Sequence, residues 1–200
     1  MASTADDAPG SDRAPTDRRV RRTLDRLRDA IIAVLGEKGY DGTRIKDVLD
    51  RADVGRSTFY EHFRSKDELL GSALARLERE LRAASAAAEP GLLLPFTLAM
   101  VRHVADNRGL HRRLPQSGPG AQVLARVRRL LVALAGEDLA GRVPAGAAVP
   151  VDALAEHAIG SFLALLEAWL AGRVAVDAAG LDALFRRLVV PGLQAALDAG

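Results

Sequence analysis

The sequence has no cysteine among its 200 residues. This absence excludes disulfide bonds, thiolate metal sites and a cysteine nucleophile, and it fits a reducing compartment. Lysine is scarce too, because only Lys38, Lys46 and Lys66 among the 28 basic residues are lysine and the others are arginine. Together with the many alanines and glycines, this bias indicates a GC-rich genome.

Long hydrophobic runs are also missing. No apolar run reaches the roughly 20 residues that a membrane span needs. The N-terminal stretch MASTADDAPGSDRAPTD has no apolar segment of the kind found in secretory signals. With 48% hydrophobic residues, the chain can still bury a substantial core. These features predict a cytoplasmic protein that does not enter a membrane.

A strong net charge is absent as well. The formal net charge is +2, and residues 1–85 hold 17 basic and 16 acidic side chains. Bulk charge therefore does not predict nucleic-acid binding, and only the placement of the charges can.

Signals for catalysis are lacking. The chain has no Gly-x-Ser-x-Gly elbow, no phosphate-binding glycine loop and no His-Glu-x-x-His motif. The histidines of the second half, His103, His111 and His157, match no metal-ligand spacing. We therefore predict no enzyme activity, no metal and no cofactor.

Residues 1–16 are rich in Ala, Ser, Asp, Pro and Gly, which predicts a disordered tail. From residue 17, apolar side chains recur at helical spacing up to a glycine stop at Gly39. Six arginines crowd the first turns of this helix, and most fit a solvated face. The leading ones also fit contacts with DNA phosphates. They are Arg18, Arg19, Arg21, Arg22, Arg26 and Arg28.

The segment 43–70 contains two short helical patterns separated by a tight turn, followed by a third. Thr43 is a good N-cap for the first helix. Asp53 tolerates the left-handed backbone that such a turn often needs. Gly55 is an acceptable N-cap for the next helix, and Ser65 with Glu68 forms a capping box. This arrangement predicts a helix-turn-helix and then a long linking helix.

Within the second helix of this motif, residues 56–63, the side chains divide between two faces. Phe59 and Phe63 lie four residues apart, so they share one face, which must be buried. Arg56, Ser57 and Tyr60 then point outward, with Thr58 and His62 partly so. Arginine, hydroxyl groups and an exposed tyrosine suit a surface that reads the DNA major groove.

The run VGRSTFYEHFRSKDELL at residues 54–70 closely resembles the helix-turn-helix signature of the tetracycline-repressor-like (TetR) family, and EKGYDGT at residues 37–43 resembles its entry. The resemblance covers about residues 18–70. It departs from the family at Asp53, where the family usually has Gly, and at Gly55, where it usually has Ser. It implies phosphate contacts by Thr43, Arg44, Tyr60, His62 and Lys66, and base contacts by Arg56, Ser57 and Thr58.

The remainder of the chain, 91–200, reads as helical throughout, so the fold class is all-α. We expect helices at about 92–107, 110–114, 119–135, 151–171 and 178–198, with loops at 115–120 and 136–150 and a bend at Pro191. The predicted domains are 17–70 for DNA binding and 71–200 for effector binding and dimerisation. The last two helices have apolar surface on more than one face, which fits a four-helix homodimer interface.

The family resemblance implies an effector pocket inside the second domain. Candidate lining residues combine apolar walls with a few polar groups, although each also fits a role in the core or on the surface. Glu167 is the most suggestive, because a buried carboxylate needs a partner, but it could instead face solvent or pair across the dimer. The candidates are Phe96, Met100, His103, His111, His157, Phe162, Glu167 and Trp169.

The sequence thus predicts a transcriptional regulator, most readily a repressor that binds a palindromic operator as a dimer and is released by a small molecule. An activator remains open, because the operator position sets the sign of regulation and lies outside this chain. A regulator without an effector remains open as well. A helical ligand carrier or enzyme is a further alternative, which the missing catalytic motifs disfavour.

Overall fold

The computed structural model describes residues 13–113, 118–144 and 149–198. Within these ranges every regular element is a helix, which confirms the all-α prediction. The first four helices are α1 (Arg13–Gly42), α2 (Ile45–Ala52), α3 (Arg56–His62) and α4 (Lys66–Ala86). They are followed by α5 (Thr97–Asp106), α6 (Arg108–Arg113), α7 (Gly118–Ala140), α8 (Val151–Leu170) and α9 (Ala178–Asp198).

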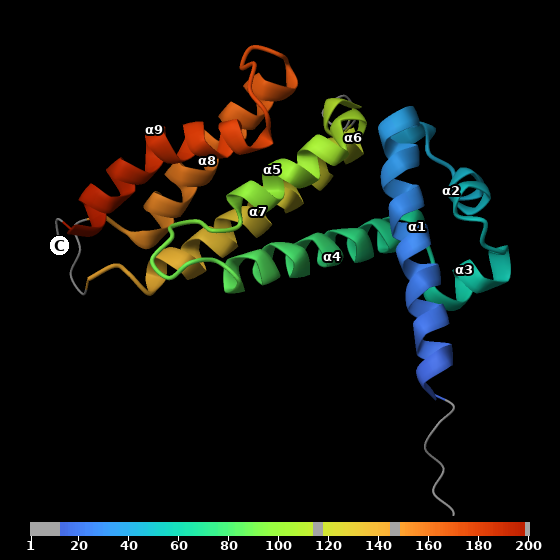
Figure 1. The fold of residues 1–200 in the computed structure, drawn as a ribbon. Helices are drawn as coiled ribbons and strands as arrows, with labels where there is room; N and C mark the ends of the chain where they lie inside the picture. The colour runs from blue at the N-terminus through green and yellow to red at the C-terminus, as the bar shows by residue number, and fades with distance from the viewer. Residues whose placement is uncertain (1–12, 114–117, 145–148, 199–200) are drawn as a thin grey trace, which may run out of the picture.

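The helices divide into a head and a body that α4 connects (Figure 1). In the head, α2 and α3 lie on one side of α1, and α4 leaves from the other side to run along the body. The head has its own core, built around Leu27, Ile31, Leu35, Phe59 and Leu69. The body has a larger core, to which α4, α5, α7, α8 and α9 contribute.

Several expected boundaries move. Residues 13–16, assigned to a disordered tail, belong to α1, whereas residues 1–12 lie outside the described residues. The expected connection 136–150 begins later, because α7 continues to Ala140. The glycines and prolines of this segment predicted a loop from Gly136 onward. Leu139 is instead fully buried against the body, and this tertiary packing extends the helix past Gly136. The long linking helix ends at Ala86.

Two backbone predictions at the head concern residues with positive φ. Gly39 has φ 70° and ψ 177°, so the helical backbone of α1 is interrupted there, as the glycine stop predicted. Asp53, the C-cap of α2, has φ 50° and ψ 53° and therefore adopts the left-handed conformation expected of the turn. Helix α9 runs through Pro191 without ending.

Helix α8 corrects the statement that long apolar segments are missing from the chain. It is long and apolar enough to meet a length-and-composition criterion for a membrane span, which the sequence inspection did not anticipate. The core helix of a soluble protein meets the same criterion, and α8 buries seven side chains in the body, including Ile159, Phe162 and Trp169. Its composition is therefore not evidence for a membrane span.

Candidate nucleic-acid interface and interior cavity

The turn between α2 and α3 is held by α1. The backbone N–H of Val54 donates to the carbonyl of Leu49 at 3.2 Å. The guanidinium of Arg26 donates to the carboxylate of Asp53 at 3.1 Å and to its backbone carbonyl at 3.3 Å. Gly55 then starts α3 from an extended conformation, as predicted for its N-cap. This role of Arg26 could not be predicted from local sequence, because its partner lies 27 residues away.

Helix α3 has one buried and one exposed face. Phe59 and Phe63 are buried with ring centroids 5.8 Å apart, which confirms their assignment to the core. Tyr60 is 51% exposed, and Arg56 and Ser57 are exposed as well. Neither Arg56 nor Ser57 uses its side chain in a hydrogen bond or ion pair within the described part of the chain. This face therefore presents donors that no internal partner occupies.

Thr58 and His62 lie at the margin of this face and are half-buried. Arg44, at the start of α2, is exposed, and its backbone N–H donates to the carboxylate of Asp47 at 3.1 Å. Lys46 is also exposed on α2 and has no ion-pair partner within the described ranges. Lys46 was not among the residues predicted to contact DNA.

Thr43 differs from its prediction as a helix cap. Arg44 is the N-cap of α2, and the Thr43 side chain is only 2% exposed. Its hydroxyl donates to the carbonyl of Gly39 at 2.6 Å, which ties the end of α1 to the start of α2. Gly39 interrupts α1, so its own carbonyl lies at a helix end, where carbonyls lack helical donors. The Thr43 hydroxyl supplies a donor to this carbonyl.

Lys66 lies at the same junction. Its ammonium donates to the carbonyls of Tyr40 at 3.0 Å and Thr43 at 3.2 Å. It also lies 4.0 Å from the centre of the Tyr40 ring. The Tyr40 hydroxyl donates to Asp67, and burial with this acceptor raises the pKa of Tyr40 to about 12. An ammonium has three donors, so one N–H of Lys66 remains for another partner.

Arginines extend the exposed surface along α1. Its first buried side chain within the described ranges is Leu27, and the preceding turns project beyond the rest of the head (Figure 1). Four arginines on these turns are exposed and form no ion pair among the described residues: Arg18, Arg19, Arg21 and Arg22. By contrast, Arg26 and Arg28 pair with Asp53 and Asp25. The four leading arginines thus differ from Arg26 and Arg28 in having no ion-pair partner within the described ranges, and their contact with phosphates stays a prediction.

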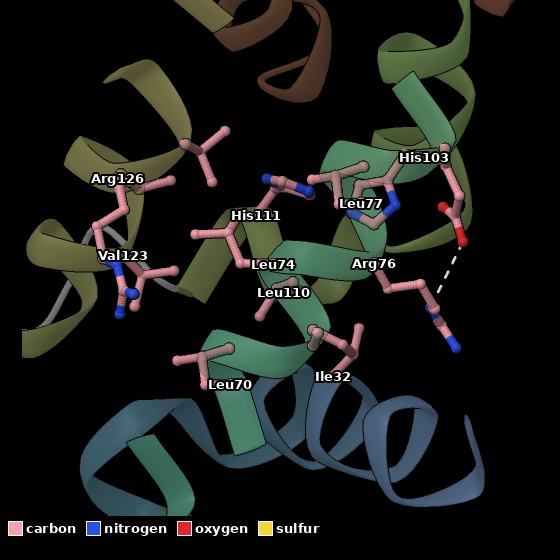
Figure 2. Close-up of a pocket in the computed structure, with 14 residues that line it drawn as sticks. Ile32, Leu70, Leu74, Arg76, Leu77, His103, Leu110, His111, Val123 and Arg126 are labelled. Atoms are coloured by element: carbon pink, nitrogen blue, oxygen red, sulfur yellow. Dashed lines mark ion pairs between the residues drawn. The ribbon is translucent and has the colours of Figure 1, made fainter. Parts of the chain in front are cut away.

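Two neighbouring cavities of the described residues are both lined by His111. The larger has a volume of about 420 Å³, and α5, α6, α7 and α8 line it. Of the expected effector residues, Met100, His111 and Glu167 line this cavity. The smaller, of about 50 Å³, lies between the head and the body, and His103 and His111 line it (Figure 2). His111, Leu124 and Val127 line both, so they form a shared wall.

The remaining expected pocket residues lie elsewhere. Phe96 and Phe162 are each 1% exposed in the core, with the Phe162 ring packed on Phe185. Trp169 is buried too, and its indole N–H donates to the carbonyl of Val176 at 2.7 Å. His157 is exposed on α8 and lines neither cavity. Glu167 lines the larger cavity and is exposed, so of the placements that the sequence left open it has the solvent-facing one.

Two histidines give the smaller cavity polar groups, and one of them, His111, also belongs to the shared wall. The rings of His103 and His111 lie 6.0 Å apart. Burial, and secondarily the neighbouring His103, lowers the pKa of His111 to about 4, so its imidazole is neutral near pH 7. Burial also lowers the pKa of His103. Nε2 of His111 is buried without a hydrogen-bond partner among the described residues.

Helix α6, which carries His111, packs closely on α1. A Cβ added to Gly36 would come within 3.0 Å of the backbone N of Leu110. A Cβ on Gly109 would come within 3.3 Å of the Gly36 carbonyl oxygen. Two glycines therefore allow the backbones of head and body to touch, and a shift of α6 cannot be absorbed by side chains at this contact.

The molecule is thus an all-helical protein with a helix-turn-helix head on a body that contains a cavity. Residues 27–73 match the family model described as bacterial regulatory proteins, tetR family. The KstR repressor of Mycobacterium tuberculosis is 43% identical over 56 residues, 28% of this chain and 26% of that protein. An uncharacterized regulator of Bacillus subtilis, YxbF, is 43% identical over 61 residues, 30% of this chain and 16% of that protein. The match with these curated relatives therefore spans only about a quarter of their length or less.

Solved structures extend the likeness to the body. A TetR regulator from Streptococcus agalactiae has 25% identity and a TM-score of 0.62, over 89% of this chain and 99% of that one. A putative TetR-family regulator from Syntrophomonas wolfei has 18% identity and a TM-score of 0.68, over 86% and 95%; at this identity the likeness concerns the fold alone. The comparisons confirm the resemblance for residues 27–73, and the described chain has the fold of TetR-like transcriptional regulators.

Proposed function

We propose that this protein is a repressor that binds a palindromic operator as a homodimer and is released by a small molecule. The observation that carries the proposal is the exposed face of α3. Arg56, Ser57 and Tyr60 project from it, and Phe59 and Phe63 anchor the helix from behind. Buried anchors fix the helix, so its outward side chains enter the major groove without reorganisation of the head.

Base reading falls mainly on Arg56, because a guanidinium can donate two parallel hydrogen bonds to the edge of a guanine. Tyr60, His62 and Arg44 surround it and suit contacts with phosphates, which fix the register of the helix. Lys66 contributes its remaining N–H, and Thr43 acts through its backbone and the packing of the α1–α2 junction, because its side chain is buried. Thr58 is half-buried and lies against the base edges only in part.

The arginines of α1 supply a second, sequence-independent contact. Arg18, Arg19, Arg21 and Arg22 are unpaired within the described ranges and lie beyond the core of the head. Each phosphate that such a cation neutralises releases counterions, so the affinity becomes steeply dependent on salt. This placement supports DNA binding even though the net charge of the whole chain is only +2.

Dimerisation through α8 and α9 is supported by their outward faces. Leu188 of α9 is 61% exposed, and Pro191 and Gly192 follow it on the exposed side. The exposed side of α8 carries the small residues Ala153 and Ala164. Small and apolar positions on these outward faces let helices of two protomers approach closely, although charged residues such as Glu156 and Arg187 are exposed there too. The dimer would then place its two copies of α3 about one DNA turn, ~34–36 Å, apart.

Release by a small molecule is supported by the path from the larger cavity to α1. His111 on α6 lines the cavity, and the same helix touches α1 through Gly36 and Gly109. A ligand that favours a different position of α6 therefore changes the position of the head. The coupling requires that the ligand bind the two arrangements with different affinities.

A mobility-shift assay with DNA from upstream of the protein's own gene tests the proposal. We expect a sequence-selective shift that weakens with salt, and its loss in Arg56→Ala and Tyr60→Ala. The matched control is Arg79→Ala, which removes an exposed arginine of α4 that forms no ion pair among the described residues. Binding that is equal for specific and scrambled DNA would contradict the proposal. If the shift occurs but the operator is needed for expression, the protein is an activator that uses the same face.

A further inference from the structure

The larger cavity has a composition that selects among ligand classes. Most of its wall is apolar, and Met100, Val104, Leu163 and Leu166 contribute to it. Its volume of about 420 Å³ lies within the range of roughly 300–1,000 Å³ that small-molecule sites occupy. A ligand that fills it must therefore be mostly apolar, because a polar body would lose its hydration without compensation.

One polar atom in the shared wall lacks a partner. Nε2 of His111 is buried, and none of the described residues hydrogen-bonds to it. Leaving such an atom unsatisfied costs about 1–3 kcal/mol. A neutral imidazole offers one donor and one acceptor, so a hydroxyl can pair with either tautomer and a carbonyl with the donor form.

The charges around the cavity disfavour an anion. Glu167 is the only charged residue among the described residues that line it. Two arginines of the neighbouring helix α6 are already engaged, since Arg108 lies over the Trp169 ring at 4.2 Å and Arg112 donates to the carbonyl of Leu170 at 3.2 Å. A carboxylate ligand would be desolvated without a cation to pair with it.

We propose that the larger cavity binds a mostly apolar small molecule with one uncharged hydrogen-bonding group, a hydroxyl or a carbonyl, and that the imidazole of His111, which lines the cavity, is the partner of that group. The inference deepens the proposed function and rests on it, since it names the chemical class of the effector. Binding fills an apolar void and gives the imidazole of His111 a hydrogen-bond partner at the same time. Because His111 belongs to α6, the ligand acts directly on the helix that touches α1.

The test uses the full-length protein without DNA and two probes of equal chain length, 1-decanol and decanoate. Trp169 is the single tryptophan and adjoins Leu170 of the cavity wall, so its fluorescence reports binding, with calorimetry as an independent measure. We expect 1-decanol to bind, and decanoate to bind at least about tenfold more weakly. Failure of 1-decanol to bind, or tighter binding of decanoate, would overturn the ligand class.

Two variants locate the polar contact. His111→Phe keeps a ring but removes the nitrogen, and we expect it to weaken 1-decanol binding by about 2- to 10-fold, the value of one neutral hydrogen bond. His157→Gln, an exposed histidine outside both cavities, is the matched control and leaves the affinity unchanged. Equal affinities of His111→Phe and the natural protein would overturn the role of His111.

Glu167→Gln provides a test that does not depend on how His111→Phe folds. Removing this carboxylate improves decanoate binding about two- to threefold, as expected for an exposed charge, and leaves 1-decanol unchanged. An equal change for both probes would overturn the electrostatic argument. These measurements contain no DNA, so a protein that binds DNA but not 1-decanol contradicts only this inference. A protein that binds 1-decanol but no DNA contradicts only the proposed function.

Discussion

Replacing Lys66 by methionine tests whether this residue stabilises the head in addition to any contact with DNA. Methionine keeps most of the apolar stem and removes the ammonium. The change deletes two hydrogen bonds, at 3.0 Å to the Tyr40 carbonyl and 3.2 Å to the Thr43 carbonyl, and the contact with the Tyr40 ring. Two partly exposed charge-assisted bonds and one exposed cation–π contact together contribute about 2–3 kcal/mol.

This loss should be visible in thermal unfolding followed by circular dichroism. For a chain of this length, each kcal/mol corresponds to roughly 2–4 °C, so we expect Lys66→Met to lower the Tm by about 4–12 °C. Lys46→Met is the matched control, because Lys46 is exposed and unpaired within the described ranges, and its Tm should change by less than about 1–2 °C. If both variants melt like the natural protein, the ammonium of Lys66 does not stabilise the α1–α2 junction.

Three further predictions concern the DNA face, the contact between head and body, and the histidines. Arg56→Ala weakens operator binding by about 1–3 kcal/mol and non-specific binding much less, as titrations with operator and scrambled DNA would show; equal losses would refute base reading. Gly36→Ala destabilises the protein by about 1–3 kcal/mol in urea titrations, because its Cβ meets the Leu110 backbone. The control Gly136→Ala has open space around its Cβ and stabilises α7 by up to about 1 kcal/mol. Equal effects of the two substitutions on the free energy of unfolding would refute the close contact. For His111, the folded-state pKa of about 4 lies below the ordinary 6.5, so the unfolded state binds a proton that the folded state does not. Stability should therefore fall as the pH drops from about 6.5 to about 4, by up to about 3 kcal/mol, and this part of the pH dependence should be missing in His111→Phe.

The local part of the head could be predicted from sequence because short-range geometry determines it. Phe59 and Phe63 are four residues apart on a helix, so they must share a face, and both are buried. Only a few residues separate the two helical patterns on either side of Asp53, so the chain must turn tightly there. Asp53 adopts the left-handed backbone that such a turn needs. The exposure of Arg56 and Ser57 follows from the same periodicity.

The contacts of Thr43 and Lys66 could not be predicted from short-range geometry. Both fit local rules, as an N-cap and as the first residue of a helix, yet their partners lie in the α1–α2 junction. The Lys66 contacts span 23 and 26 residues, and no periodicity specifies which carbonyls an ammonium reaches over that distance. The assignment of Lys66 to phosphate contacts stays a prediction.

The cavity was harder to predict than the head, because apolar side chains at helical spacing look alike whether they pack on each other or line a void. Phe96, Phe162 and Trp169 proved to be core residues, while Val104 and Leu163, which the sequence did not single out, line the larger cavity. The difference depends on how α5, α7 and α8 are spaced. Among the polar candidates, His111 differs from the others because one of its ring nitrogens is buried without a hydrogen-bond partner among the described residues. This property exists only in the folded chain.

The central claim is that two copies of α3, one from each protomer, read a palindrome through their exposed faces. Hydroxyl-radical footprinting of the operator tests it most directly. We predict two symmetric protected regions with centres one helical turn or a whole multiple of a turn apart, and loss of both in Arg56→Ala. A single protected region, or uniform protection without sequence preference, would contradict the account.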